Sequence, residues 1–262
     1  MMRIHYHEDY FLADVLTAER LTPSMYRIVI GVRKHERLRP THHADEWVRL
    51  AFPHAPGEPV TLPQFRNGKW GRFDGSCPCP NRPYTVRRWD GTTGEMIIDL
   101  VAHEGGVGAS WAKTARRGDV VGICTPEGRY QLTDDAEWLL LLSDITGLPA
   151  VGRVLEELPA GFRAIVHVEV PSDADRQEID TVADASIAWH YSHGLKSDRP
   201  GYTELPRIAG SITELPKGPG YIYIAGEARA VSESRKHFRD LLGFDKSRID
   251  AIGYWIEGQA RV

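Results

Sequence analysis

The spacing of hydrophobic residues changes part-way along the chain. In the first half, short runs alternate apolar and polar residues, as in residues 47–52, where Val48, Leu50 and Phe52 share one face. Six such runs predict six strands, a common number for a small barrel: 11–16, 25–30, 47–52, 82–89, 96–102 and 120–124. Residues 90–94 are typical of a hairpin turn. The proline- and glycine-rich stretch 53–83 predicts no regular element.

In the second half, short buried strands alternate with helices. Strands are predicted at 138–142, 164–170, 187–191, 221–225 and 249–254, and helices at 149–158, 205–212 and 231–242. This alternation is typical of a parallel sheet that helices cover on both faces. The change falls at the polar residues 131–137. We therefore expect an antiparallel β-barrel domain at residues 1–133 and an α/β domain at residues 134–262.

Bulk composition excludes several classes of protein. The chain has 262 residues and a formal net charge of −4, which does not favour a nucleic-acid partner. The first residues lack the apolar run of a signal peptide, and no stretch approaches the ~18 apolar residues of a membrane span. We expect a cytoplasmic protein with no integral membrane segment.

The three cysteines do not form a disulfide framework. Cys77-Pro78-Cys79 resembles half of a metal site, but no second Cys/His pair stands at zinc-finger spacing. We therefore expect no metal, and a pair of thiols in a surface loop.

The first candidate site is Arg82-Pro83-Tyr84-Thr85, inside a predicted strand. The planar guanidinium of Arg82 can pair with a flavin nucleotide phosphate. Tyr84 can stack on the isoalloxazine ring, and the Thr85 hydroxyl can bond its polar edge. Taken alone, the four residues fit equally a surface arginine and a half-buried tyrosine of a barrel strand.

A glycine-rich turn strengthens the flavin hypothesis. Asp99, Val101 and His103 alternate on the strand before it, and His103 can bond a phosphate or the ribityl chain. Gly105, Gly106 and Gly108 let backbone amides approach an anion closely. Ser110 stands where a helix begins, with its free amides and positive dipole end.

Two strand-to-helix turns of the second half are candidates for a nicotinamide nucleotide. Ligands of such sheets bind beyond the carboxyl ends of the strands. Asp144, Thr146 and Gly147 follow the first strand, and Gly226, Glu227 and Ala228 follow the fourth. The glycine fingerprint of dinucleotide-binding folds is absent, so an ordinary strand-to-helix turn is an equal alternative at the first place.

Seven short motifs together resemble the siderophore-interacting protein family, the FAD-dependent ferric-siderophore reductases, across nearly the whole chain. They are Arg82-Pro83-Tyr84-Thr85, Asp99-Leu100-Val101-Ala102-His103, Gly108-Ala109-Ser110-Trp111-Ala112, Leu148-Pro149-Ala150-Val151-Gly152-Arg153, Leu155-Glu156-Glu157-Leu158-Pro159, Ala225-Gly226-Glu227-Ala228 and Gly253-Tyr254-Trp255.

The resemblance implies an FAD-binding six-stranded barrel followed by an NAD(P)H-binding domain, the ferredoxin-reductase-like architecture. It implies flavin contacts at Arg82, Tyr84, Thr85, His103, Gly108, Ala109 and Ser110, and nicotinamide contacts near Asp144, Thr146, Gly226 and Glu227. The implied reaction passes a hydride from NAD(P)H to FAD and then single electrons to Fe(III) in a siderophore, which releases Fe(II). No general base is needed, so no catalytic side chain is expected.

Several points stay open at this level. Ile145 stands where the family usually has an acidic or polar residue. Ile256-Glu257 stands where the family often has basic residues that help to hold the siderophore, so the siderophore is undetermined. Lys69, Arg129 and Arg261 are substrate candidates. Asp173 and Asp175 favour NADH, whereas Arg176 and Arg229 can hold the phosphate of NADPH. We expect a monomer. The alternatives are a general NAD(P)H:flavin or ferredoxin-type oxidoreductase and a non-catalytic siderophore-binding protein.

Overall fold

The computed structural model describes residues 10–62, 64–66, 69–71, 77–192 and 203–259. The chain divides into two compact units. The first holds the residues up to 129 except 22–24, and the second holds residues 22–24 and 130–261. Each unit has its own hydrophobic core.

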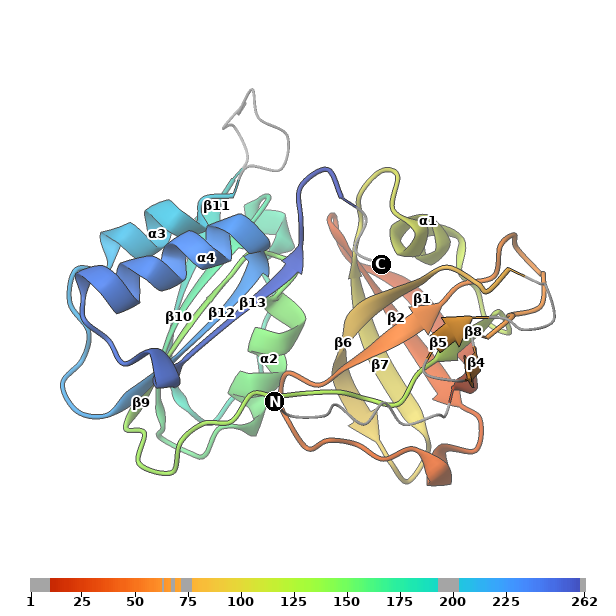
Figure 1. Ribbon diagram of the computed structural model, residues 1–262, viewed down its shortest axis with the longest axis horizontal. Helices are drawn as coiled ribbons and strands as arrows, with labels where there is room; N and C mark the ends of the chain where they lie inside the picture. The colour runs from red at the N-terminus through yellow and green to blue at the C-terminus, as the bar shows by residue number, and fades with distance from the viewer. Residues whose placement is uncertain (1–9, 63, 67–68, 72–76, 193–202, 260–262) are drawn as a thin grey trace. The chain divides into compact units, whose positions relative to one another are not determined.

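The first unit is a closed six-stranded barrel with the strand order β1-β2-β7-β6-β3-β8 (Figure 1). Its barrel strands are β1 Phe11–Thr22, β2 Met25–Val32, β3 Trp47–Ala51, β6 Asn81–Asp90, β7 Glu95–Val101 and β8 Val120–Ile123. Helix α1, Val107–Thr114, follows β7. The expected antiparallel barrel is confirmed, because the alternating apolar residues of these strands form one buried core.

A short hairpin lies in the stretch for which the sequence predicted no regular element. Strand β4, Gln64–Arg66, pairs antiparallel with β5, Lys69–Gly71. Each strand has three residues. This is too short for hydrophobic alternation to be detected, so the prediction of an irregular segment was wrong there.

Two arginine–aspartate pairs of the barrel unit differ mainly in burial. Arg27 donates to both Asp99 oxygens at 2.8 and 2.7 Å, and Arg33 donates to both Asp14 oxygens at 2.8 and 2.5 Å. The side chains of Arg27 and Asp99 are 25% and 0% exposed, whereas those of Arg33 and Asp14 are 48% and 39% exposed.

We expect Asp99→Ala to lower the free energy of unfolding by about 2–3 kcal/mol, because it removes the carboxylate that accepts two hydrogen bonds from a partly buried guanidinium. Asp14→Ala breaks an equally well-formed but exposed pair and should cost less than about 1 kcal/mol. Urea denaturation of both variants measures the difference. Equal losses would show that burial does not set the strength of these pairs.

The second unit contains a five-stranded parallel sheet with the order β11-β10-β9-β12-β13. Its elements are β9 Trp138–Ser143, α2 Leu148–Glu157, β10 Arg163–Val170, β11 Asp184–Tyr191, α3 Leu205–Ser211, β12 Gly220–Glu227, α4 Ala228–Lys236 and β13 Ile249–Trp255. Short helical turns lie at Asp173–Asp175, His237–Leu241 and Lys246–Arg248 in this unit, and at His35–Arg37 in the first unit. The predicted parallel sheet is confirmed.

Helices cover both faces of this sheet (Figure 1). Trp138, Leu140 and Leu142 of β9 face the side on which α3 and α4 pack. Helix α2 lies on the other side, with Val151, Val154 and Leu155 buried. Because both faces are covered, the free edge at the carboxyl ends of the strands is where a ligand can reach the sheet.

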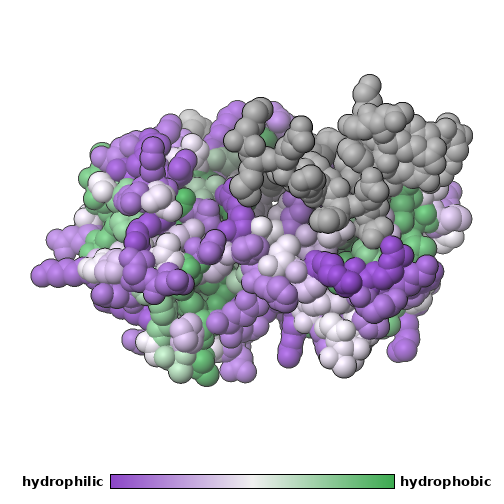
Figure 2. All heavy atoms as spheres, turned by 60° about the horizontal axis from the view of Figure 1, so that its bottom comes forward, coloured by the Kyte–Doolittle hydropathy of each residue, from purple (hydrophilic) through white to green (hydrophobic). Residues whose placement is uncertain are grey.

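Hydrophilic and apolar side chains are mixed on the face that Figure 2 shows. Figure 2 shows hydrophilic residues over most of the visible face, with smaller apolar areas between them. Among the described residues, no helix is long and apolar enough to cross a bilayer.

Candidate functional site

Tyr84 of the first candidate motif is partly buried and faces the barrel core. Its cross-strand neighbour is the core residue Val48, so Tyr84 lies on the inner face of β6, where it packs against the barrel core. Its ring meets Phe52 edge-on, with centroids 6.2 Å apart. Burial raises the pKa of Tyr84 to about 12, so the phenol keeps its proton at neutral pH.

Gly108, in the first turn of α1, lies directly against that phenol. A Cβ atom at position 108 would lie 1.9 Å from the Tyr84 oxygen and 3.1 Å from the Phe52 ring. The position therefore requires glycine, and the strand motif and the glycine-rich turn, far apart in sequence, meet in the structure. The first helical hydrogen bond runs from the Ser110 amide to the Gly106 carbonyl at 2.9 Å.

The amides at the start of α1 are suited to an anion. Because the helical hydrogen bonds begin at the Ser110 amide, the amides of Val107, Gly108 and Ala109 have no acceptor within the helix. No side chain caps this terminus among the described residues. With the positive end of the helix dipole, it forms the kind of site that holds a pyrophosphate. Ala109 is buried and Ser110 is exposed.

His103 and Gly106 also lie together at this turn. The His103 ring occupies the space that a Cβ at Gly106 would fill, 2.1 Å from its Cε1 atom, and its Nδ1 lies 3.1 Å from the Glu104 carbonyl oxygen. Val101 ends β7 just before the turn. The structure therefore brings His103, Gly106, Gly108 and Tyr84 into one region.

The remaining strand residues have different surroundings. Arg82 is half-buried, and its Nη1 donates to the Asn81 carbonyl at 2.7 Å. Thr85 pairs with Trp47 and is buried on the opposite face of β6 from Tyr84. Asp99 is fully engaged by Arg27, which indicates a structural task for this carboxylate.

In the second unit, Asp144 joins three strand ends. Its Oδ1 accepts hydrogen bonds from the Thr146 amide at 2.8 Å and the Thr146 hydroxyl at 2.5 Å. Its Oδ2 accepts from the Glu227 amide and from Trp255 Nε1, both at 2.9 Å. Burial raises the pKa of Asp144, while these four donors favour the ionised form. The carboxylate therefore fixes the turn after β9 to the ends of β12 and β13.

Glu227 begins helix α4 and leaves one buried oxygen without a partner. Its Oε2 accepts from the amides of Arg229 at 2.7 Å and Ala230 at 2.9 Å. Glu227 is 4% exposed, yet its Oε1 has no hydrogen-bond partner within the part of the chain that the structure describes. Buried polar atoms are nearly always paired, so this oxygen is an acceptor that a ligand can use.

At three glycines along the same edge of the sheet, neighbouring atoms occupy the space in which a Cβ atom would lie. Gly226 has φ 155°, and a Cβ there would lie 2.6 Å from Asp144 Oδ2. A Cβ at Gly147 would lie 2.8 Å from the Cβ atoms of Ser143 and Ala225. Ala228 lies under Gly253 of β13, where a Cβ would approach its own to 2.7 Å. All six nicotinamide candidates therefore surround one edge of the sheet.

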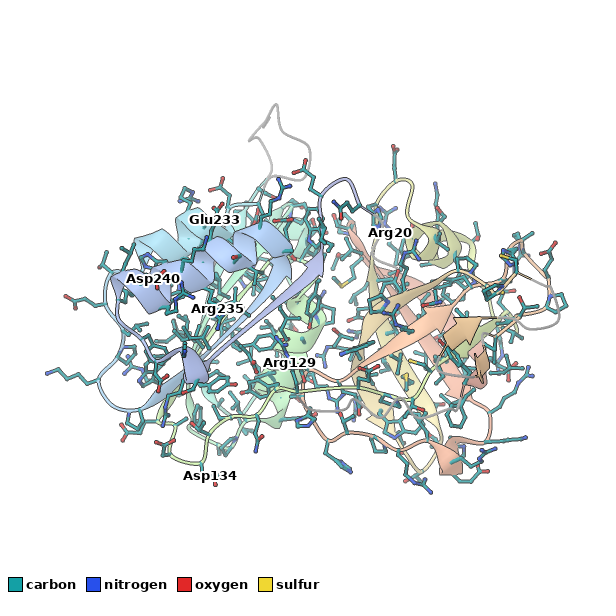
Figure 3. The ribbon with its side chains drawn as sticks, in the orientation of Figure 1. Arg20, Arg129, Asp134, Glu233, Arg235 and Asp240 are labelled. Carbon is teal, nitrogen blue, oxygen red and sulfur yellow. The ribbon has the colours of Figure 1, made fainter. Side chains whose placement is uncertain are left out.

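The structure places two of the three substrate candidates. Arg129, labelled in Figure 3, is exposed on the segment after β8, and its amide donates to Asp45 Oδ1 at 2.9 Å. Lys69 lies in β5. Arg261 lies outside the described residues.

The two loop cysteines differ in exposure. Cys77 is exposed, as expected, but Cys79 is buried, so the expectation of two surface thiols was wrong for Cys79. The reason is local pairing: the Cys79 amide donates to the Thr61 carbonyl at 2.9 Å, and the Thr61 amide donates to Cys79 Sγ at 3.2 Å. Among the described residues, no group of three or more Cys, His, Asp or Glu side chains is placed to hold a metal.

Sequence reasoning missed two aromatic residues at these sites. Phe52 packs on Tyr84 and on Trp111, at 6.2 and 5.2 Å between centroids, and its place at the end of an alternating strand was the available signal. Trp255 was noted as part of a motif, but its bond to Asp144 spans 111 residues and has no local signal.

Comparison with known proteins shows the family of the chain. Residues 14–130 match the siderophore-interacting FAD-binding domain, and residues 136–258 match the siderophore-interacting protein family. The chain belongs to the siderophore-interacting protein family. The resemblance seen in the sequence motifs is thereby confirmed, as is the expectation of FAD as a cofactor.

Individual relatives of this siderophore-interacting protein include named reductases. Ferric vibriobactin reductase ViuB of Vibrio cholerae is 30% identical over 217 residues, which cover 81% of this chain and 77% of ViuB. An NADPH-dependent ferric-chelate reductase of Escherichia coli is 27% identical, over 92% and 91% of the two chains. The crystal structure of a siderophore utilization protein from T. fusca superposes with a TM-score of 0.82, at 30% identity over 98% and 97% of the chains.

Proposed function

We propose that this protein is a flavin-dependent ferric-siderophore reductase. Its family assignment, the barrel site around Tyr84 and Gly108, and the polar edge around Asp144 support the proposal together. The observation that carries it is the close approach of Gly108 to the Tyr84 phenol, because it joins a flavin-type strand motif to a helix terminus suited to a pyrophosphate.

The residues of the barrel fit FAD. The unpaired amides of Val107, Gly108 and Ala109 would hold the pyrophosphate, and Arg82 would neutralise its charge. The partly buried, protonated Tyr84 offers an aromatic surface for the flavin, and Ser110 and His103 offer polar groups beside it. Held by these residues, FAD would supply an acceptor for the hydride of NAD(P)H and a donor of single electrons to Fe(III).

The second unit would bind the nicotinamide nucleotide. Thr146 and the turn that begins at Asp144 lie at the carboxyl end of β9, where a nucleotide phosphate binds in such sheets. Glu227 Oε1 has no partner among the described residues and can accept a hydrogen bond from a carboxamide or a ribose hydroxyl. NADPH dependence of the E. coli relative supports this role.

Reduction explains release of the metal without destruction of the chelator. Fe(III) is a hard ion that siderophore oxygens hold tightly, and Fe(II) is softer and is held more weakly by the same oxygens. Protein side chains need only bind and orient the partners, so the absence of an assigned general base is consistent with the reaction.

The decisive experiment is an anaerobic titration followed by absorbance. The protein with FAD should lose its flavin band near about 450 nm when NADH or NADPH is added, and regain it with a ferric siderophore. A flavin band that neither coenzyme bleaches would favour a siderophore-binding protein without turnover. Bleaching reversed by free flavin or ferredoxin, but not by a ferric siderophore, would favour a general oxidoreductase.

Arg82→Ala is expected to weaken FAD binding by at least about tenfold, because a charge-assisted phosphate contact is lost. The barrel should stay folded, since Arg82 is half-buried and its one described hydrogen bond is to its neighbour Asn81. Flavin fluorescence titration measures affinity, and circular dichroism checks the fold. Retention of FAD with wild-type affinity would refute the assignment of Arg82.

Three further features belong to the proposal. The functional domains divide between residues 133 and 134, the protein acts as a monomer, and it acts in the cytoplasm. Mass photometry tests the oligomeric state, and cell fractionation tests the compartment. Separate expression of residues 1–133 and retention of FAD by that fragment would test the boundary.

A further inference from the structure

A polar and aromatic cluster lies at the carboxyl ends of β10 and β11. Asp173 Oδ1 accepts hydrogen bonds from Arg176 Nη1 at 3.3 Å and from the Tyr191 hydroxyl at 2.9 Å. The Arg176 guanidinium stands 5.9 Å from the centre of the Trp189 ring. We call Asp173, Arg176, Trp189 and Tyr191 the ribose cluster, for the reason given next.

The strand order gives this cluster a place along a bound nucleotide. Counted from the start of the second unit, the order β11-β10-β9-β12-β13 is 3-2-1-4-5. In sheets of this order the pyrophosphate lies at the turn after the first strand, and an acidic residue farther along the chain bonds the adenosine ribose. Asp144 and Thr146 occupy the first turn, and Asp173 follows the second strand, β10.

Of the two carboxylates in this turn, one has a structural task. Asp175 is buried and accepts from the Thr22 hydroxyl at 3.0 Å, the Ser24 amide at 2.7 Å and the Ser172 hydroxyl at 2.9 Å. The side chain of Asp173 is instead 75% exposed. Tyr191 and Arg176 lower the pKa of Asp173, so it is ionised at neutral pH.

The arginine of the turn is already paired. Arg176 is the one cation among residues 171–176, and its charge is balanced by Asp173. A 2′-phosphate placed here would meet the Asp173 carboxylate and compete with it for Arg176. A free 2′-hydroxyl would instead donate a hydrogen bond to that carboxylate.

We propose that Asp173 makes this protein select NADH over NADPH. The inference rests on the proposed function, since it requires a nicotinamide nucleotide on the second unit. The carboxylate accepts the ribose hydroxyl of NADH and repels the 2′-phosphate of NADPH, while Arg176 is held on Trp189. The selectivity arises at the ribose, so it changes the affinity for NADPH and leaves the step at the flavin unchanged.

The test is the rate of anaerobic FAD reduction by each coenzyme in the holoprotein. We expect kcat/KM to favour NADH by at least about tenfold, the discrimination expected of a repulsive charge at a partly solvated site. Asp173→Asn should raise kcat/KM for NADPH by about tenfold through KM, with kcat little changed. The control is Asp240→Asn: Asp240, labelled in Figure 3, also pairs with a neighbouring arginine, at 2.5 Å from Arg239. It should leave the coenzyme ratio unchanged.

Preference for NADPH in the unmodified protein, or an unchanged ratio in Asp173→Asn, would overturn the inference. Calorimetric titration of the holoprotein with 5′-AMP and 2′,5′-ADP tests the selection without turnover. Tighter binding of 5′-AMP than of 2′,5′-ADP, with a smaller difference in Asp173→Asn, supports the selection. This holds even if neither coenzyme reduces FAD. Failure of both coenzymes to reduce FAD would count against the proposed reductase alone. Equal or tighter binding of 2′,5′-ADP counts against the selection.

Discussion

Gly108→Ala is expected to weaken FAD binding by at least about tenfold and to lower the free energy of unfolding by about 1–3 kcal/mol, in the range of an overpacked core. The added Cβ would lie 1.9 Å from the Tyr84 oxygen and 2.8 Å from its Cζ atom, far inside contact distance. Tyr84 is packed between Phe52 and the barrel core, so it can move only by disturbing them. Flavin fluorescence titration and urea denaturation measure the two effects.

The matched control is Gly210→Ala in α3. Gly210 is also a helical glycine, but nothing lies within 4 Å of its would-be Cβ. Alanine favours a helix over glycine by about 1 kcal/mol, so this variant should keep or gain stability and bind FAD normally. Tyr84→Phe, which removes the clashing oxygen, should recover part of the loss in the double variant. Wild-type FAD affinity in Gly108→Ala would disprove the close contact.

Asp144→Asn is expected to lower the free energy of unfolding by about 2–4 kcal/mol and to slow reduction by nicotinamide at least about tenfold. Both Asp144 oxygens accept two hydrogen bonds each. Asparagine puts an NH₂ group in place of one carboxylate oxygen. The two hydrogens of this group then face the two donors that the oxygen accepted, so these donors must move away. The turn that carries Thr146 or the edge that carries Glu227 is then displaced.

Asp245→Asn is the control for that exchange. Asp245 is exposed and accepts a hydrogen bond from the Ser247 amide at 2.9 Å, a position where asparagine caps as well as aspartate. Stability and reduction rate should both stay near their original values. Denaturation together with the rate of flavin bleaching separates an unfolded Asp144→Asn protein from a folded one with a displaced edge. A variant that keeps both quantities would show that the four bonds are dispensable.

Local patterns were sufficient for most of the fold. The alternation of Val48, Leu50 and Phe52 follows directly from a strand with one buried face, and the buried runs of the second half follow from a sheet covered on both faces. The β4–β5 hairpin was not predicted, because a strand of three residues is too short to show an alternation of apolar and polar residues. The burial of Cys79 was not predicted, because it depends on hydrogen bonds with Thr61 across a loop.

The candidate sites were found by residue type, but their chemistry depends on distant contacts. Asp99 and Val101 fitted a flavin strand equally well, and only the pairing of β2 with β7 shows that Arg27 occupies the Asp99 carboxylate. Asp173 and Asp175 were equivalent candidates for a ribose. Their difference arises from Thr22 and Ser24, which bond Asp175 from about 150 residues away. No local spacing encodes such partners.

The bond between Asp144 and Trp255 also constrains the order in which the protein can be made. Asp144 follows the first strand of the second unit, and its partner ends the last strand, β13. A ribosome releases the chain from its amino terminus, so the barrel is complete in the nascent chain well before Trp255 is available. The edge of the sheet that Asp144 and Trp255 join is therefore among the last parts of the second unit to form.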